Sequence, residues 1–419
     1  MNINEIINNY ETPMYIYWRE IIEQKYDDLK SCLFPSSTIY YSMKANPLIG
    51  ICQILHEKGC GVEVASAGEM NVALKAGFDP GEIIFTSPGK TYKEIEYAIQ
   101  NRIKVINIES YQEALIINEI ARKEKYIMNI ALRVNPALIL NSAKIKMSGI
   151  SSQFGIEEEE INDNFINKIK KLENVKIVGF QIYVGTQILN ALEICNNTKS
   201  IIEIAIKLSR KFKIKLDYLN MGGGFGVPYF PNEKELNLVT LKEEMQKIYS
   251  FYLEDIKHTE LIFESGRYLT AEAGVYVTKV LYKKCSKGTQ YIICDGGSNF
   301  HAGSAFLGRF VRNNFPFHTI PDNDCKNVVN IVGPLCTPTD VIGQKVEVNC
   351  FLQSGDYVII EKSGAYGLTY SPLKFLSHDT PLEVLIDGKK VYIMRERGTA
   401  EDCLLGQNFL AAVDNNGTV

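Results

Sequence analysis

Short apolar segments rich in β-branched residues alternate with longer segments of helical periodicity through the first two thirds of the chain. This alternation is typical of βα units, and the helical segments are amphipathic, for example over residues 93–99 and 201–212. Eight such strands favour an α/β fold of the closed (β/α)8 TIM-like barrel type over an open doubly wound sheet. The predicted strands are residues 39–44, 62–65, 83–86, 105–108, 130–134, 177–183, 216–220 and 261–264.

The pattern changes after about residue 274, where β-rich segments follow one another with little helical periodicity between them. A further strand is predicted over residues 12–18, which lie outside the barrel count and are expected to pair with the β-rich part. We therefore predict two domains. The barrel comprises residues 19–273, and residues 1–18 join residues 274–419 in a β-rich domain.

The charge balance excludes some classes of partner. The chain carries 45 Lys and Arg residues against 49 Asp and Glu residues, a formal net charge of -4. This argues against binding of nucleic acid or of an anionic membrane. No window approaches the ~20 apolar residues of a membrane span, and the first residues lack the features of a secretory signal. We expect a cytoplasmic protein.

Cysteine and histidine spacing gives no metal or disulfide pattern. The ten cysteines are scattered without a C-x-x-C pair, which suits reduced thiols better than a disulfide framework. The five histidines share no H-x-x-H or H-E-x-x-H spacing, so no dedicated metal site is expected.

A run of three glycines follows the seventh predicted strand, in the segment Asn220-Met-Gly-Gly-Gly-Phe-Gly226. Without Cβ atoms, the backbone amides of such a run can approach an anion closely. Barrels of this type frequently hold phosphate after strands seven and eight. A flexible turn is the alternative, but the position after strand seven favours a phosphate site.

Three chemically active residue types are predicted at the same mouth of the barrel. Lys44 ends the first strand, and the eighth strand delivers Glu264 and Arg267. The simpler interpretations are a solvated lysine and a local ion pair. Together with a glycine phosphate site, however, these residues match the needs of pyridoxal phosphate, which are a Schiff-base lysine, a carboxylate for the pyridine nitrogen and a cation for the phosphate.

Two other charged segments are given structural interpretations. The segment Ser87-Pro-Gly-Lys-Thr91 resembles the end of a Walker A loop, but the first glycine of that motif would fall at Ile84. The acidic run over residues 157–160 is predicted to be a solvated helix start, where negative charge suits the helix dipole.

These motifs resemble the fold type III pyridoxal-phosphate decarboxylases, the family that includes the diaminopimelate and ornithine decarboxylases. The resemblance spans nearly the whole chain in family order. It implies an alanine-racemase-like barrel, a pyridoxal-phosphate-dependent carboxy-lyase activity and a homodimer with shared active sites. The segments that carry it are YYSMKANP, GVEVASAGE, RVNP, QFGI, YVGTQ, NMGGGFG, ESGRYLTAEAG, GPLCTPTD and SGAYGL.

The resemblance implies a role for each matching residue. Lys44 is implied to form the Schiff base, and Cys336 to enter the partner subunit's site and protonate the carbanion left by CO₂ loss. Glu264 is implied to pair with the pyridine nitrogen, and Glu63 and Arg133 to lie beside the cofactor. The residues implied to contact the phosphate are Gly222, Gly223, Gly224, Arg267 and Tyr366.

The chain departs from the family pattern at three places. Tyr183-Val-Gly-Thr186 stands where the family has His-x-Gly-Ser, so Tyr183 is expected to stack on the cofactor, with Thr186 also at the cofactor. Thr337 replaces the acidic residue that follows the family cysteine and receives a distal ammonium. Residues 295–304 lack the arginine that grips the second carboxylate of diaminopimelate.

A pocket without either charged group suggests a substrate whose far end is neutral or tethered. The segments are similar to those of one branch of the family, in butirosin antibiotic biosynthesis, which decarboxylates a glutamyl group thioesterified to an acyl carrier protein. That branch implies an acyl carrier protein as partner and a γ-aminobutyryl product. Candidate contacts for the carrier are Arg309, Arg312 and Lys374.

Alternatives to this function stay open. One is a decarboxylase of a free amino acid such as diaminopimelate, lysine or ornithine. An inactive relative that dimerises with a true enzyme is disfavoured because Lys44, Glu264 and Cys336 are all present. A racemase of the same barrel family would give no reason for GPLC and SGAYG to occur together.

Overall fold

The computed structural model describes residues 3–136, 145–146, 152–305 and 313–410. The chain forms two compact units. One consists of Trp18–Gly274 and Lys362–Tyr366, and the other of Met1–Tyr17, Val275–Glu361 and Gly367–Val419. The sequence-based ranges assigned residues 362–366 to the β-rich domain, whereas the contacts of this segment join it to the barrel.

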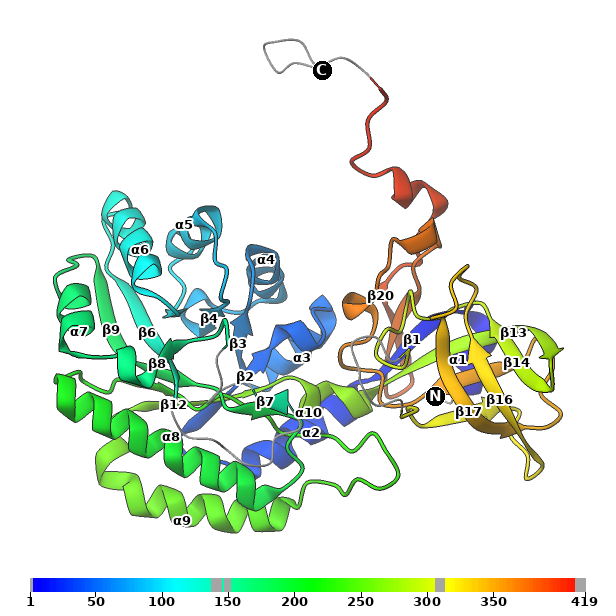
Figure 1. Ribbon diagram of the computed structural model, residues 1–419, viewed down its shortest axis with the longest axis horizontal. Helices are drawn as coiled ribbons and strands as arrows, with labels where there is room; N and C mark the ends of the chain where they lie inside the picture. The colour runs from blue at the N-terminus through cyan, green and yellow to red at the C-terminus, as the bar shows by residue number, and fades with distance from the viewer. Residues whose placement is uncertain (1–2, 137–144, 147–151, 306–312, 411–419) are drawn as a thin grey trace. The chain divides into compact units, whose positions relative to one another are not determined.

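The first unit is a closed barrel of eight parallel strands with helices around it (Figure 1). The strands follow the order β5-β4-β3-β2-β12-β11-β9-β6, and pairing of β5 with β6 closes the circle. The prediction of a (β/α)8 TIM-like fold is therefore confirmed. The barrel strands are β2 (Ser37–Ser42), β3 (Gly61–Val64), β4 (Ile83–Thr86), β5 (Val105–Ile108), β6 (Met128–Asn135), β9 (Val175–Ile182), β11 (Tyr218–Asn220) and β12 (Glu260–Ser265).

Short elements extend the barrel. Strand β8 (Ile156–Glu157) pairs with the end of β6, and β7 (Ile145–Lys146) pairs with β10 (Gly185–Thr186). Lys44, predicted as the last residue of a strand, lies instead in a 3-10 turn, η1 (Met43–Ala45), because β2 ends at Ser42. The remaining 3-10 turns of this unit are η2 (Pro80–Glu82), η3 (Glu158–Glu160) and η4 (Ala271–Ala273).

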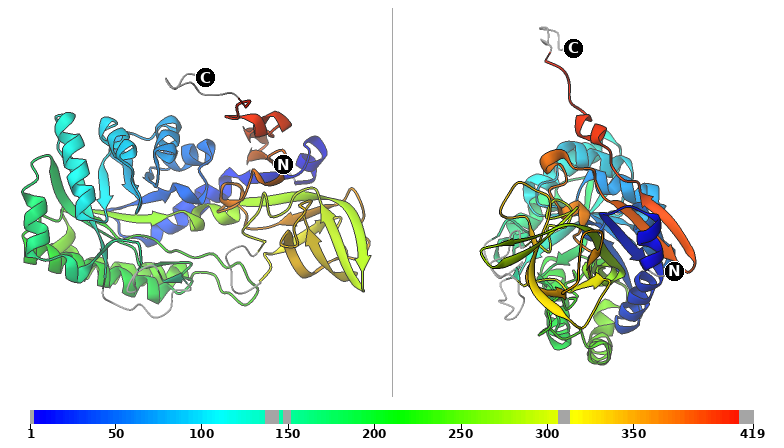
Figure 2. Two further views of the ribbon diagram at one scale, coloured as in Figure 1. Left: turned by 45° about the horizontal axis from the view of Figure 1, so that its top comes forward. Right: turned by 90° about the vertical axis from the view of Figure 1, so that its right-hand side faces the viewer.

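Helices cover the outside of the barrel, and the long α8 and α9 lie side by side (Figures 1 and 2). Side-chain caps mark the starts of three helices. The side chains of Ser66, Thr91 and Ser110 accept hydrogen bonds from amides in the first turns of α4, α5 and α6, respectively. The helices are α2 (Arg19–Cys32), α3 (Ile49–Glu57), α4 (Ala67–Ala76), α5 (Tyr92–Gln100), α6 (Tyr111–Lys123), α7 (Asp163–Lys170), α8 (Ala191–Phe212), α9 (Leu238–Ile256) and the short α10 (Arg267–Thr270).

Inward-facing side chains fill the barrel, so its centre is a packed core. Two of them are tyrosines, Tyr40 and Tyr218, and both are buried. A Cβ atom on Gly61 would lie 2.5 Å from the ring of Tyr40, so only glycine leaves room for this ring beside β3. The buried cluster comprises Tyr40, Ile84, Val105, Ala131, Val178, Tyr218 and Ile262.

The second unit is built on a sheet with the strand order β17-β16-β14-β13-β1-β19-β20, and β18 pairs with both β13 and β15. Strand β1 therefore joins this sheet, as predicted for residues 12–18, and Figure 2 shows the blue N-terminal strand beside the orange C-terminal strands. The strands are β1 (Met14–Trp18), β13 (Gly274–Ser286), β14 (Thr289–Cys294), β15 (Phe317–Ile320), β16 (Lys326–Val332), β17 (Val341–Asn349), β18 (Tyr357–Ile360), β19 (Leu382–Asp387) and β20 (Lys390–Arg395). The helical elements are α1 (Ile3–Asn9), η5 (Leu368–Tyr370), η6 (Phe375–Ser377) and η7 (Ala400–Leu404).

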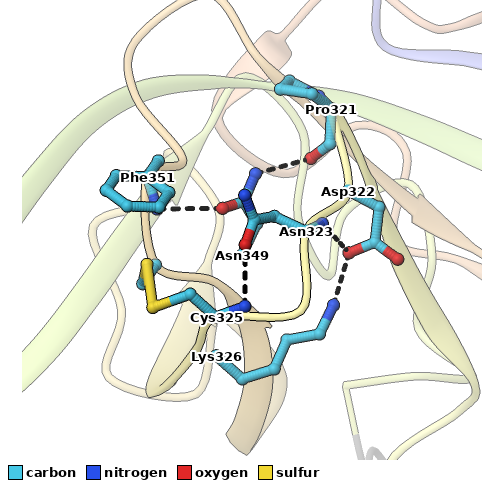
Figure 3. The surroundings of a disulfide bond; sticks show 8 residues. Pro321, Asp322, Asn323, Cys325, Lys326, Asn349 and Phe351 are labelled. Atoms are coloured by element: carbon cyan, nitrogen blue, oxygen red, sulfur yellow. Dashed lines mark hydrogen bonds and ion pairs between the residues drawn. A yellow bond between two sulfur atoms is a disulfide. The ribbon is translucent and has the colours of Figure 1, made fainter.

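One pair of cysteines is oxidised, which differs from the expectation of reduced thiols. Cys325 and Cys350 form a disulfide whose Cα atoms lie 5.5 Å apart (Figure 3). These residues directly flank β16 and β17, which pair through Lys326 and Asn349. Antiparallel pairing brings them together although 25 positions separate them in the sequence, and no local spacing pattern marks such a pair.

Across the described residues, none of the helices combines the length and the apolar character needed to cross a bilayer.

Candidate active site

A pocket opens at the C-terminal ends of the barrel strands and gathers most of the residues singled out from the sequence. They arrive from strands β2, β11 and β12, from the segment after β9 and from the inserted segment Lys362–Tyr366. The pocket is lined by Ser42, Lys44, Tyr183, Thr186, Gly223, Gly224, Phe225, Glu264, Ser265, Gly266, Arg267 and Tyr366.

The glycine run after β11 forms a turn in which backbone replaces side chains. Gly222 and Gly224 have φ values of +62° and +104°, a region that favours glycine. A Cβ atom on Gly223 would lie 2.2 Å from the carbonyl oxygen of Glu264. The run therefore packs directly against the end of β12, and no other residue type fits there.

The amides of this turn divide into two groups. The Gly222 amide donates to Asn220 Oδ1 at 2.9 Å. Within the described residues, the amides of Gly223 and Gly224 have no protein acceptor. Gly223 and Gly224 line the pocket and can donate to an anion, whereas Gly222 shapes the turn.

Arg267 supplies the positive charge beside this turn. Its guanidinium lies 4.5 Å from the centre of the Tyr366 ring, and its Nη1 donates to the Tyr229 hydroxyl at 3.2 Å. Its Nε atom is buried without a hydrogen-bond partner, and so is the hydroxyl of Ser265. Two buried unpaired polar groups beside free glycine amides form a site for an anion such as phosphate.

The inserted segment Lys362–Tyr366 holds Tyr366 over Arg267. The Tyr366 amide donates to the carbonyl of Ala45 at 2.7 Å, and Asn46 Nδ2 donates to the carbonyl of Gly364 at 3.0 Å. Tyr366 itself has φ +54°, a strained backbone conformation for a tyrosine. Hydrogen bonds to the residues beside Lys44 thus hold one wall of the pocket in place.

Lys44 is the cation that faces the carboxylates of the site. Its Nζ atom lies 3.2 Å from Oε2 of Glu63, which is buried on β3. Burial disfavours the ammonium, but the carboxylates of Glu63 and Glu264 outweigh this effect and raise the pKa of Lys44.

Glu264 is buried on β12, and its surroundings favour the neutral carboxyl. Burial raises the pKa of Glu264 to about 7, and the nearby charge of Glu63 adds to the increase. Lys44 and the hydrogen bond from Asn220 act in the opposite direction. Burial also raises the pKa of Glu69 to about 7, with Glu63 contributing.

Asn220 is a site residue that the sequence patterns did not single out. Its Nδ2 donates to Glu264 Oε1 at 2.7 Å, and its Oδ1 accepts the amide of Gly222. One amide side chain therefore fixes both the carboxylate and the start of the glycine turn. Its position two residues before the glycine run was the only available signal.

Tyr183 and Thr186 lie on the pocket wall beside the glycine turn. A Cβ atom on Gly222 would lie 2.8 Å from Cδ2 of Tyr183, so the ring packs against the turn. Burial raises the pKa of Tyr183 to about 12, with Lys44 and a hydrogen bond with Thr186 opposing the shift. Tyr183 therefore stays neutral and offers an aromatic surface to the pocket.

Arg133 is buried and bound to a neighbour, and it does not line the pocket. Its Nη1 donates to Glu109 Oε1 at 2.8 Å, and its guanidinium lies 4.9 Å from the ring centre of Phe154. Glu109 Oε2 accepts the amide of Gly155 at 2.7 Å. Arg133 therefore joins two of the sequence motifs and lowers the pKa of Glu264 from a distance.

Cys336 is exposed in the β-rich unit, in the loop between β16 and β17. It does not line the barrel pocket. Its role stays a prediction.

The pocket fits pyridoxal phosphate. The unpaired Arg267 Nε, the unpaired Ser265 hydroxyl and the glycine amides match a phosphate, and Lys44 and Glu264 line the same pocket. In the part of the chain that the structure describes, no three His, Cys, Asp or Glu side chains gather so as to hold a metal ion.

The raised pKa of Glu264 predicts a pH-dependent stability of the cofactor-free protein. The ordinary value is 4.5 and the folded value is about 7, so the protonated carboxyl favours folding below about pH 4.5. This contribution is lost as the pH rises through 7. Glu264→Gln removes the titration, so thermal scans from about pH 5 to about pH 8 are expected to show wild type losing stability relative to the variant. A constant difference across that range would contradict the raised pKa.

Comparison with known proteins identifies the family of the chain. The family model for the pyridoxal-dependent decarboxylases, pyridoxal binding domain, matches residues 19–271. The chain is 40% identical over 415 residues to the L-glutamyl-(BtrI acyl-carrier protein) decarboxylase of Niallia circulans, which covers 97% of this chain and 96% of that protein. It is 31% identical over 402 residues to the diaminopimelate decarboxylase of Aquifex aeolicus, with 95% and 92% covered.

Solved structures agree with the sequence comparisons. The crystal structure of diaminopimelate decarboxylase from Helicobacter pylori complexed with L-lysine superposes with a TM-score of 0.85 at 28% identity, and covers 96% of this chain and 98% of that one. The resemblance noted in the sequence motifs is confirmed. The chain belongs to the pyridoxal-dependent decarboxylases, carboxy-lyases whose cofactor is pyridoxal phosphate.

Proposed function

We propose that this enzyme removes the α-carboxylate of a glutamyl group held as a thioester on an acyl carrier protein, and so forms a γ-aminobutyryl thioester. The observation that carries the proposal is the absence of charged side chains at the two positions where the family resemblance implies groups that recognise a charged distal end. A γ-thioester has no charge at that end, so it needs neither group.

The first of these positions is Thr337. Its hydroxyl is hydrogen bonded to the Thr339 hydroxyl at 2.9 Å. A threonine hydroxyl cannot provide the counter-charge that a distal ammonium requires. A free diamine end would therefore have no anionic partner here.

The second position is the segment 295–304, which contains no arginine. Its carboxylate, Asp295, accepts hydrogen bonds from the hydroxyls of Thr12 and Thr278 and has a structural role. His301 is buried between aromatic rings and bonds to Ser304 at 2.9 Å. The segment offers no cation for a second substrate carboxylate.

The relatives fit this substrate better than the alternative. The relative at 40% identity acts on a glutamyl group of an acyl-carrier protein, whereas a diaminopimelate decarboxylase is 31% identical. The latter similarity keeps a free amino acid such as diaminopimelate as the second candidate.

The described residues suggest how the cofactor is held. Arg267, Ser265 and the amides of Gly223 and Gly224 would hold its phosphate, and Glu264 would face its ring nitrogen. Bound pyridoxal phosphate supplies an electron-accepting ring that takes up the electron pair left when the α-carboxylate departs as CO₂.

The protein groups around Lys44 manage its proton. Lys44 must be neutral to bond the cofactor, whereas Glu63 Oε2, 3.2 Å from Nζ, stabilises the ammonium, so Lys44 has to give up its proton when the cofactor enters. Tyr183 and Tyr366 line the same pocket as Lys44 and offer aromatic surface to the cofactor.

We further propose that the enzyme works in the cytoplasm as a homodimer in which Cys336 serves the partner's pocket and delivers a proton to the substrate α-carbon. Its exposure suits a residue that meets a second subunit. This exchange gives each site one residue from the other chain.

The substrate proposal predicts selective turnover. The substrate is an acyl carrier protein loaded with L-glutamate through the γ-carboxyl. The purified enzyme with pyridoxal phosphate is expected to release about one CO₂ per loaded carrier, seen by mass spectrometry as a loss of about 44 Da. Free glutamate, lysine, ornithine and diaminopimelate are expected to release none at equal concentration. Turnover of diaminopimelate, lysine or ornithine instead would show that another residue receives the distal charge and would exclude the tethered substrate.

Shared sites predict recovery of activity on mixing two inactive variants. Lys44→Ala is expected to abolish turnover, and Cys336→Ala to lower kcat by about 100-fold. In a dimer of one variant with the other, one pocket regains both residues. Mixing equal amounts after subunit exchange should therefore restore about one quarter of wild-type activity. No recovery, with exchange verified by mass spectrometry, would mean that Cys336 does not serve the partner's pocket.

A further inference from the structure

Two tyrosines hold Arg267, the arginine of the phosphate site. Its Nη1 donates to the Tyr229 hydroxyl at 3.2 Å, and its guanidinium lies 4.5 Å from the centre of the Tyr366 ring. Its Nε atom is buried and has no hydrogen-bond partner among the described residues. The orientation in which Arg267 offers this donor to a ligand therefore depends on two tyrosines from distant parts of the chain.

Lys362 joins the two chain segments that carry these tyrosines. It begins the inserted segment 362–366, which ends at Tyr366. Its Nζ atom donates to the carbonyl of Pro228, the residue before Tyr229. One side chain thus ties the segment that follows the glycine run to the segment that places Tyr366.

Glu272 holds Lys362 in this position. Its Oε1 lies 3.2 Å from Nζ of Lys362, and its Oε2 pairs with Lys25 of α2. Burial opposes the ionisation of Glu272, but the two lysines outweigh this effect and lower its pKa, so the carboxylate is charged at neutral pH. The three side chains are only 19% to 24% exposed, so solvent screens these ion pairs less than pairs on the open surface.

Backbone hydrogen bonds fix the inserted segment independently of this ion pair. The amides of Ser363 and Gly364 donate at 2.7 and 3.0 Å to carbonyl groups at the first residues of β13 and η4, respectively. Loss of the Lys362 side chain is therefore expected to leave this segment in place. It would release mainly the segment of Pro228 and Tyr229, on the other side of Arg267.

We propose that Lys362 is a positioning residue for the cofactor phosphate and acts through Tyr229 and Arg267. The inference concerns the cofactor site and goes beyond the proposed substrate. With Lys362 in place, Tyr229 orients the guanidinium so that its unpaired Nε can donate to the phosphate. Without it, the guanidinium loses one of its two orienting contacts, while Lys44 and Glu264 at the other end of the cofactor keep theirs.

The test compares two ligands that differ only in the phosphate. Pyridoxal phosphate and pyridoxal share the ring and the aldehyde that Lys44 bonds, but only the first has a group for Arg267. Both are titrated into the full-length, cofactor-free protein by isothermal titration calorimetry. The variant is Lys362→Met, which keeps the length of the side chain and removes its charge. The control is Lys58→Met, which removes a barrel lysine that is 27% exposed and pairs with Asp27.

Lys362→Met is expected to raise the Kd for pyridoxal phosphate about tenfold and to change the Kd for pyridoxal by less than about twofold. Lys58→Met should match wild type with both ligands. An unchanged Kd for pyridoxal phosphate in Lys362→Met, equal losses with both ligands, or the same phosphate-dependent loss in Lys58→Met would overturn the proposal.

Glu272→Gln provides a second variant if Lys362→Met does not fold. Its amide keeps the size of the side chain and removes the charge that holds Lys362. A smaller increase of about threefold in the Kd for pyridoxal phosphate is expected, again without a change for pyridoxal. A loss that is the same for both ligands, or no loss with either, would contradict the proposed role of Lys362.

The measurement involves neither a carrier protein nor release of CO₂, so an error in the proposed substrate leaves its outcome unchanged. It also leaves aside the carrier contacts expected from the sequence, of which Lys374 is exposed, and Arg309 and Arg312 lie outside the described residues. Wild-type protein that binds pyridoxal as tightly as pyridoxal phosphate would remove the phosphate site itself, and with it the role of Lys362.

Discussion

Two buried carboxylates, Glu63 and Glu264, share one lysine at the mouth of the barrel, and this electrostatic arrangement dominates the site. Burial and mutual repulsion disfavour two full negative charges, which is why the pKa of Glu264 rises to about 7. Lys44 offsets part of this cost through its contact with Glu63. A cationic ring nitrogen beside Glu264 would offset the rest, so the site is arranged for a cofactor that brings positive charge.

The phosphate end of the pocket depends on backbone geometry. The glycine turn packs against Glu264 so closely that one Cβ atom on Gly223 would collide with its carbonyl, and Asn220 ties the turn to the same glutamate. The ring-nitrogen and phosphate ends are thereby fixed relative to each other. The inserted segment Lys362–Tyr366 completes the pocket and places Tyr366 over Arg267.

The barrel was predictable because its pattern is local and repeated. Each predicted strand overlaps an observed one, and the mouth residues followed from the rule that strand ends gather there. Features that depend on distant parts of the chain could not be predicted. The Cys325–Cys350 disulfide and the insertion of residues 362–366 into the barrel are of this kind.

The role of Lys90 in the segment Ser87–Thr91 also depends on a distant part of the chain and could not be predicted. In the sequence it belonged to a rejected phosphate loop, and a solvated lysine would be the default. In the structure its side chain is fully buried, and its Nζ lies 2.6 Å from Oε1 of Glu113 on helix α6. Glu113 Oε2 in turn accepts the amide of Glu109, the partner of Arg133. Only the fold reveals that this lysine supports the ion pair between Glu109 and Arg133.

The central claim is that the barrel mouth holds pyridoxal phosphate on Lys44. The most direct measurement is peptide mass spectrometry of the holoenzyme after borohydride reduction, which fixes the bond between cofactor and lysine. We expect the phosphopyridoxyl mass on the peptide that contains Lys44 and on no other lysine peptide. Attachment to a different lysine, or no attachment in an enzyme that is active with pyridoxal phosphate, would contradict the account.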